Sequence, residues 1–246
     1  MEGAKEVSAR GDIFAALRSS LDSGGTIDAR RAAVAARLAA PPRIAPMGRV
    51  RDVDLVETFK QRAGDLGVTI SHIAAVAELG PAVAEYLRAR NLPQTARISP
   101  EMANLNVAWP ATLEVSAGGT DGTDPVGVTL ARAGVAETGT VVMASGPQSP
   151  TKLNYLPESH IVVLPASAIV ASYEQGLDIA RGQDRAARLP RTINWISGPS
   201  RTADIEQTIL VGVHGPKRIH VVIVDEVIDL RRMQNDLASL GGVALP

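Results

Sequence analysis

The chain has 246 residues, of which 45% are apolar and 21% charged, as is typical of a soluble globular protein with one large α/β domain. Its net charge of −1 and its 3% of aromatic residues give no reason to expect nucleic acid as a partner. It contains no cysteine, which excludes disulfides, a cysteine nucleophile and iron–sulfur clusters bound by this chain on its own. No apolar run approaches the ~20 residues that span a bilayer, and the first residues lack the apolar core of a signal peptide. We therefore expect a cytoplasmic protein without a membrane span.

The first fifty residues are predicted to form a basic, helical arm. Helical patterns cover Asp12–Leu21 and Ile27–Ala39, and Pro41-Pro42 ends the second one. Up to Arg51 the arm has nine Lys or Arg against five Asp or Glu. It is either a docking arm for another subunit or a solvated arm that covers the edge of the core, and we prefer the second interpretation because most charge runs are simply solvated. The predicted organisation is an arm over residues 1–50, an α/β domain over 51–230 and a C-terminal tail over 231–246.

From Asp52 onward, helical and strand patterns alternate. Amphipathic helices are predicted over Asp54–Leu66 and Pro81–Arg90. Short strands are predicted at Val68-Thr69-Ile70 and Thr95–Ile98. A loop-rich stretch then runs from Pro100 to Pro125, and connections of this length in a compact domain are usually functional or mobile.

The second half of the chain is rich in strands. The predicted strands are Val126–Leu130, Gly139–Ala144, Ile161–Leu164, Thr192–Ile196 and Ile219–Val224. Helices are predicted over Ala168–Ala180 and over Pro199–Leu210, the latter between the last two strands. Strands joined by crossover helices predict a mostly parallel sheet flanked by helices. The expected fold class is therefore α/β, with a helical N-terminal arm.

The segment Ser197–Glu206, followed by the glycine-rich turn Gly212–Pro216, is the strongest candidate for a binding site. It follows a predicted strand and opens a predicted helix, which is where ligands bind in parallel α/β sheets. The start of a helix has unpaired N–H groups and partial positive charge, and both favour a carboxylate or a phosphate. The candidate ligand-binding residues are Ser200, Arg201, Thr202, His214 and Gly215.

A second candidate is the segment Ala136–Thr140 between two predicted strands. A glutamate in a tight, glycine-containing connection can project into a cleft as base, acid, nucleophile or ligand anchor. The alternative is a turn glutamate on the surface, and the spacing does not decide between the two. We take Glu137 as the candidate catalytic residue, with Thr138 and Gly139 as ligand contacts.

The four histidines form no metal-binding motif. His214 and His220 are six residues apart, and no H-E-x-x-H occurs. No G-x-G-x-x-G follows a strand either, so dinucleotide binding has no support. We expect His72, His160 and His220 to be strand-end or packing residues, and we predict no metal site.

These segments resemble the lactate utilization protein C family, which is built on the LUD domain. The resemblance rests on Ala136–Thr140, on Leu156-Pro157 and His160 before an apolar strand, and on Gly198–Glu206 closed by Gly212–Pro216. It covers roughly residues 50 to 225. It implies a fold similar to the NagB/RpiA/CoA-transferase group and a role in oxidising L-lactate to pyruvate, beside two partner proteins of which at least one carries iron–sulfur clusters.

The resemblance therefore implies a component of a cytoplasmic lactate-oxidising system. Such a component would bind a small carboxylate or phosphorylated ligand, hold no cofactor of its own and work with iron–sulfur proteins. Two alternatives stay open: a stand-alone transferase or hydrolase of acyl-CoA type with Glu137 as nucleophile, and a non-catalytic assembly module. A shared fold does not establish shared chemistry.

Overall fold

The structure, a computed structural model, describes residues 9–22, 25–40, 54–181, 189–205 and 208–229. The chain divides into two units, Met1–Met47 and Gly48–Pro246. The tail predicted at 231–246 lies outside the described residues. None of the helices in these ranges is both long and apolar enough to cross a membrane.

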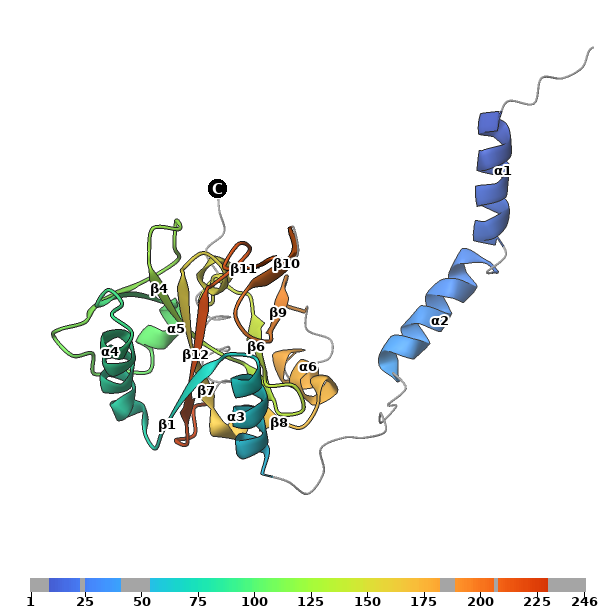
Figure 1. Ribbon diagram of the computed structural model, residues 1–246. Helices are drawn as coiled ribbons and strands as arrows, with labels where there is room; N and C mark the ends of the chain where they lie inside the picture. The colour runs from blue at the N-terminus through green and yellow to red at the C-terminus, as the bar shows by residue number, and fades with distance from the viewer. Residues whose placement is uncertain (1–8, 23–24, 41–53, 182–188, 206–207, 230–246) are drawn as a thin grey trace, which may run out of the picture. The chain divides into compact units, whose positions relative to one another are not determined.

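The first unit contains the two predicted helices of the arm, α1 (Ala9–Asp22) and α2 (Ile27–Ala39), shown in blue in Figure 1. Thr26 caps α2, because its Oγ1 accepts a hydrogen bond from the N–H of Ala29. No residue of α2 is buried, and large apolar side chains of both helices are exposed. The exposed apolar side chains are Ile13, Phe14, Leu17, Leu21, Ile27, Val34 and Leu38.

The second unit is built around a six-stranded sheet in the order β1-β12-β7-β4-β2-β3. Its strands are β1 (Thr69–Ile73), β2 (Thr95–Ile98), β3 (Glu114–Ala117), β4 (Val126–Leu130), β7 (Ser159–Pro165) and β12 (Arg218–Val224). Every neighbouring pair is parallel. The α/β fold class, with a mostly parallel sheet flanked by helices, is confirmed.

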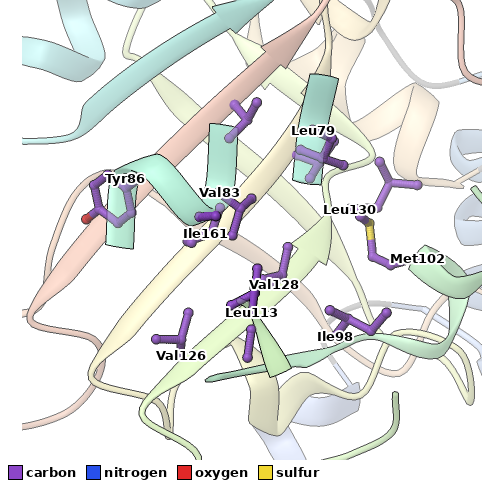
Figure 2. Close-up of a cluster of buried hydrophobic side chains, with 14 of the residues drawn as sticks. Leu79, Val83, Tyr86, Ile98, Met102, Leu113, Val126, Val128, Leu130 and Ile161 are labelled. Carbon is purple, nitrogen blue, oxygen red and sulfur yellow. The ribbon is translucent and has the colours of Figure 1, made fainter. Parts of the chain in front are cut away.

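Both faces of this sheet are covered, which is why its central strands are apolar without interruption. Because side chains alternate between the faces of a strand, Ile161 and Val163 of β7 pack on one side and Val162 and Leu164 on the other. Figure 2 shows the first cluster, in which Ile161 and strand β4 meet the helix α4 (Leu79–Ala89). The second cluster contains residues of α3 (Leu55–Asp65).

A smaller sheet packs on the α3 side, in the order β8-β5-β6-β9. Its strands are β5 (Ala133–Val135), β6 (Thr140–Ala144), β8 (Ile169–Val170) and β9 (Ile193–Ile196). Val141 and Met143 of β6 join the core beneath the six-stranded sheet, while Val142 packs with Ala180 of α6 (Tyr173–Arg181). The chain enters this second sheet from β4 through Ala131 and Arg132.

The predicted helix over Pro199–Leu210 is wrong. This segment forms an antiparallel hairpin of β10 (Arg201–Ile205) and β11 (Thr208–Val211), in which Arg201 pairs with Val211. Ile205 and Ile209 recur at helical spacing, but β-branched residues favour strands when a partner strand is available. The prediction therefore mistook a coincidence of spacing for a helix.

The two strands on either side of this hairpin lie in different sheets, so they are not joined by a crossover helix in one parallel sheet as expected. β9 lies in the smaller sheet, antiparallel to β6, whereas β12 lies between β1 and β7. The helix predicted over Ala168–Ala180 begins only at Tyr173, because Ile169 and Val170 pair with β5 as the strand β8. The stretch from Pro100 to Pro125 contains the short helix α5 (Pro100–Ala103) and the strand β3. Short 3₁₀ helices are η1 (Val76–Glu78), η2 (Thr151–Asn154) and η3 (Ala166–Ala168).

Candidate functional site

The turn between β5 and β6 holds Glu137, Thr138 and Gly139. Gly139 has a φ of 64°, and a Cβ at this position would overlap the backbone of Ala63 in α3. Only glycine meets both demands, because other residues resist this φ and would collide with the helix. The turn is therefore fixed tightly against α3.

Glu137 lies at the start of α6. Its Oε1 accepts a hydrogen bond from the N–H of Tyr173 at 3.3 Å, and its own N–H donates to the carbonyl of Ala171. Gln175 completes this helix start by accepting from the N–H groups of Ala171 and Ser172. A carboxylate is stabilising at a helix N-terminus, where it satisfies an unpaired N–H and faces the positive end of the helix dipole.

Four hydroxyl groups gather beside this turn, and we call them the hydroxyl cluster: Thr138, Thr140, Tyr173 and Ser197. Thr140 Oγ1 lies 2.8 Å from Thr138 Oγ1, 3.0 Å from the Tyr173 hydroxyl and 2.7 Å from Ser197 Oγ. The ring of Tyr173 packs on Trp195, with centroids 4.9 Å apart. Ser197 thus links the start of the predicted Ser197–Glu206 segment to the Glu137 turn.

Ser200, Arg201 and Thr202 do not lie at a helix entry. The Nη2 of Arg201 donates to the carbonyl of Leu66 at 3.2 Å, and Leu66 is the C-cap of α3. The guanidinium therefore lies at the negative end of a helix dipole, so the expected anion site at a helix start has lost its physical basis. Ser200 holds the Gly212–Pro216 turn, because its backbone bonds to Pro216 and Gly212 and its Oγ accepts from the N–H of His214. Thr202 pairs with Leu210 within the hairpin.

His214 and Gly215 line a cavity of about 370 Å³ next to this turn. The other lining residues are Tyr155, Leu156, Pro157, Glu158, Gly212, Val213 and Lys217. Lys217 Nζ lies 2.7 Å from Glu158 Oε1, and this hydrogen bond holds the pKa of Glu158 below its ordinary value. Because Lys217 directly precedes β12 and Glu158 precedes β7, the cavity lies at the amino end of the parallel sheet. The turn Gly212–Pro216 was expected beside a ligand site that follows a strand of the parallel sheet, and the structure places it before β12 instead.

At the carboxyl end of the sheet, the structure places a pair that the sequence reasoning missed. Glu101 of α5 and Arg132, which follows β4, have exposed fractions of only 1% and 5%. The Nη2 of Arg132 donates to Glu101 Oε2 at 2.6 Å. Burial raises the pKa of Glu101 above its ordinary value, against the opposing effect of the Arg132 charge. The available signal was a single arginine between two apolar strands, where an ionised side chain needs a partner.

The remaining histidines are packed or paired as strand residues. His160 and His220 are buried, and burial lowers the pKa of His160 to about 3 and that of His220 to about 4. His160 bonds to Thr129, and His220 stacks on a tyrosine of α4. His72 lies 2.7 Å from Asp225, on the surface. Within the described part of the chain, no three His, Asp or Glu side chains gather closely enough to hold a metal ion.

Comparison with known proteins finds similarity to a known family within the second half of the chain. Residues 123–224 match the family described as the LUD domain. The chain is 40% identical over 102 residues to Lactate utilization protein C 1 of Bacillus mycoides (strain KBAB4), covering 41% of this chain and 44% of that protein. It is 38% identical over 102 residues to Lactate utilization protein C of Bacillus subtilis (strain 168), covering 41% and 42%. The chain thus spans less than half of the length of the curated relatives it matches.

A solved structure supports the fold. The crystal structure of a DUF162 family protein from Deinococcus radiodurans superposes with a TM-score of 0.52 and 22% sequence identity, covering 71% of this chain and 99% of that one. The matched LUD segment contains Arg132, the Glu137 turn, the hydroxyl cluster and the cavity beside His214. Residues 123–224 of this chain are therefore similar to the LUD domain family.

Proposed function

We propose that this chain is a component of a cytoplasmic system that oxidises L-lactate to pyruvate. The observation that carries the proposal is the LUD domain match, together with relatives about 40% identical that are named Lactate utilization protein C. The ligand and the partners in this proposal are inferred from the donor groups of the chain and from its lack of cysteine.

The ligand in this proposal is a small anion, of which L-lactate and pyruvate are the simplest examples. Both carry a carboxylate and a second oxygen on the neighbouring carbon. The matched segment contains donors of the kind that such ligands need at two separate places, the hydroxyl cluster and Arg132. A glutamate nucleophile at Glu137 gains no support from this geometry, because its carboxylate already bonds to the start of α6.

The partners in this proposal are iron–sulfur proteins. Oxidation of L-lactate to pyruvate releases two electrons and two protons, so an electron acceptor is required. The 246 residues contain no cysteine, and iron–sulfur clusters are normally held by cysteine thiolates. Electron transfer would accordingly pass to other proteins of the system.

The test is genetic and biochemical. Deletion of the gene is expected to abolish growth on L-lactate as sole carbon source, while growth on pyruvate and on glucose stays normal. The complementing full-length chain is expected to restore growth and to co-purify with a protein that shows the absorbance of iron–sulfur clusters. Normal growth of the deletion strain on L-lactate would overturn the proposal.

A further inference from the structure

Glu101 and Arg132 form a buried pair that follows two neighbouring strands, β2 and β4. The connections that leave these two strands run toward opposite sides of the sheet. Ser99 directly follows β2, Glu101 comes two residues later, and Arg132 follows the neighbouring strand β4. From β2 the chain leads to β3 at the edge of the sheet, whereas from β4 it leads to β7 on the other side. In open α/β sheets, such a switch point at the carboxyl ends of the strands is the usual place for a ligand.

Polar atoms at this point are buried and lack partners. Ser99 and Glu101 have exposed fractions of 0% and 1%, and that of Arg132 is 5%. Among the described residues, Ser99 Oγ, Glu101 Oε1 and the Nε and Nη1 of Arg132 have no hydrogen-bond partner. A buried polar atom without a partner has lost the hydrogen bonds it made with water, so native proteins rarely keep several such atoms together.

Stability does not explain this arrangement. A buried ion pair usually adds little net stability, because removing two charges from water offsets their attraction. The same strand β2 carries a better-engaged pair nearer to the surface, since Arg97 Nε lies 3.2 Å from both carboxylate oxygens of Asp124. The interior pair, in contrast, shares one hydrogen bond, although the Ser149 side chain also stabilises the Glu101 carboxylate. The Nε and Nη1 of Arg132 remain without a partner.

We propose that Ser99, Glu101 and Arg132 form a binding site for a small 2-hydroxy or 2-oxo monocarboxylate, whose carboxylate binds Arg132. The class of ligand rests on the proposed role in lactate oxidation. The guanidinium is planar and always charged, so its free N–H groups suit a second carboxylate. The hydroxyl of Ser99 is available to the oxygen on the neighbouring carbon.

Glu101 is suited to share the arginine with a ligand. Two carboxylates at one guanidinium repel each other, and a proton on one of them removes that repulsion. Burial already raises the pKa of Glu101, which makes uptake of this proton easier. The connection between β6 and β7 covers the pair, because Gln148 accepts a hydrogen bond from the N–H of Glu101 at 3.2 Å. This covering segment has to be displaced for a ligand to enter.

The test measures binding of L-lactate and pyruvate to the full-length chain by calorimetry and by the ligand-induced rise in Tm. Lactamide, which has the shape of lactate without its charge, serves as the ligand control. The double variant E101L/R132M replaces the ion pair by apolar groups, which proteins often tolerate, and is expected to fold and to weaken binding at least tenfold. R97Q, which breaks the pair nearer the surface, is expected to leave the Kd within twofold. E101Q keeps the arginine and is expected to bind at least as tightly as the wild type.

The possible results separate this inference from the proposed function. If E101L/R132M folds and keeps wild-type affinity, the pair is not the site, although the chain still binds the ligand. If the wild-type chain binds neither L-lactate nor pyruvate, or binds lactamide equally well, the inference is also overturned. Growth of the deletion strain on L-lactate then decides independently whether the proposed function stands.

Discussion

The two buried histidines predict that the protein loses stability in mildly acidic solution. His160 has no exposed surface, and His220 is 3% exposed. Burial disfavours the charged imidazolium, so the pKa of His160 falls to about 3 and that of His220 to about 4. In the unfolded chain both groups have a pKa near 6.5. Below that pH the unfolded state takes up protons that the folded state refuses, so stability present above about pH 6.5 is lost as the pH falls.

The magnitude follows from these pKa values. Between about pH 7.5 and pH 5, each histidine lowers the free energy of unfolding by about 2 kcal/mol, or about 4 kcal/mol together. Because domains are typically stable by only about 5–15 kcal/mol, this loss is readily measured. The raised pKa of Glu101 acts in the opposite direction, since the folded state then binds a proton more readily than the unfolded state. Comparison of variants with the wild type cancels that contribution.

The assay is urea unfolding of the wild type, H160Q and H220N at the two pH values. The Gln side chain offers an amide in place of the Nε2 that faces Thr129, and Asn does the same for the Nδ1 that faces Thr69. Each variant is expected to lose about 2 kcal/mol less than the wild type on acidification, whatever its stability at the higher pH. An equal loss in all three proteins would refute the reasoning, because it would show that neither histidine resists protonation in the folded state.

Substitutions at Gly139 and Glu137, with Gly64→Ala as a control, test the Glu137 turn. Gly139→Ala is expected to lower the free energy of unfolding by about 2–4 kcal/mol, because it combines an unfavourable φ with overlap on α3. At Gly64 in α3 an added Cβ meets no atom within 4 Å, so Gly64→Ala is expected to raise the free energy of unfolding by up to about 1 kcal/mol. Equal unfolding free energies for the two variants would contradict the packing of this turn on α3. Glu137→Ala is expected to cost about 1 kcal/mol by removing the acceptor for the Tyr173 N–H, and Glu137→Gln about half as much, because an amide oxygen remains. Unchanged Tm values for both would show that this hydrogen bond does not stabilise α6.

The structure brings only part of the two candidate segments together. Thr138 and Ser197 come together through the hydroxyl cluster, and Glu137 accepts from the N–H of Tyr173 beside it. His214 and Gly215 instead line a cavity at the amino end of the parallel sheet. Arg201 donates a hydrogen bond to the carbonyl of Leu66, the C-cap of α3, so its guanidinium interacts with the negative end of that helix.

Local pattern alone determined much of this protein. Apolar runs identified β4 and β7, and proline with helical spacing identified α4, because strand and helix periods are written in neighbouring residues. The resemblance to the LUD domain family rested on Ala136–Thr140, on Leu156-Pro157 with His160, and on Gly198–Glu206 closed by Gly212–Pro216, and residues 123–224 match that family. Those features depend on short stretches of chain.

Tertiary structure alone decided which strand pairs with which. The spacing of Ile205 and Ile209 is compatible with a helix and with a hairpin, and only the pairing of β10 with β11 decides between them. The sequence of β9 is compatible with either sheet, and only its pairing with β6 places it in the smaller one. Glu101 and Arg132 lie 31 residues apart in the chain and become partners only because β2 and β4 are neighbours in the sheet. Strand order is fixed by the burial of two sheets at once, and no local pattern contains that information.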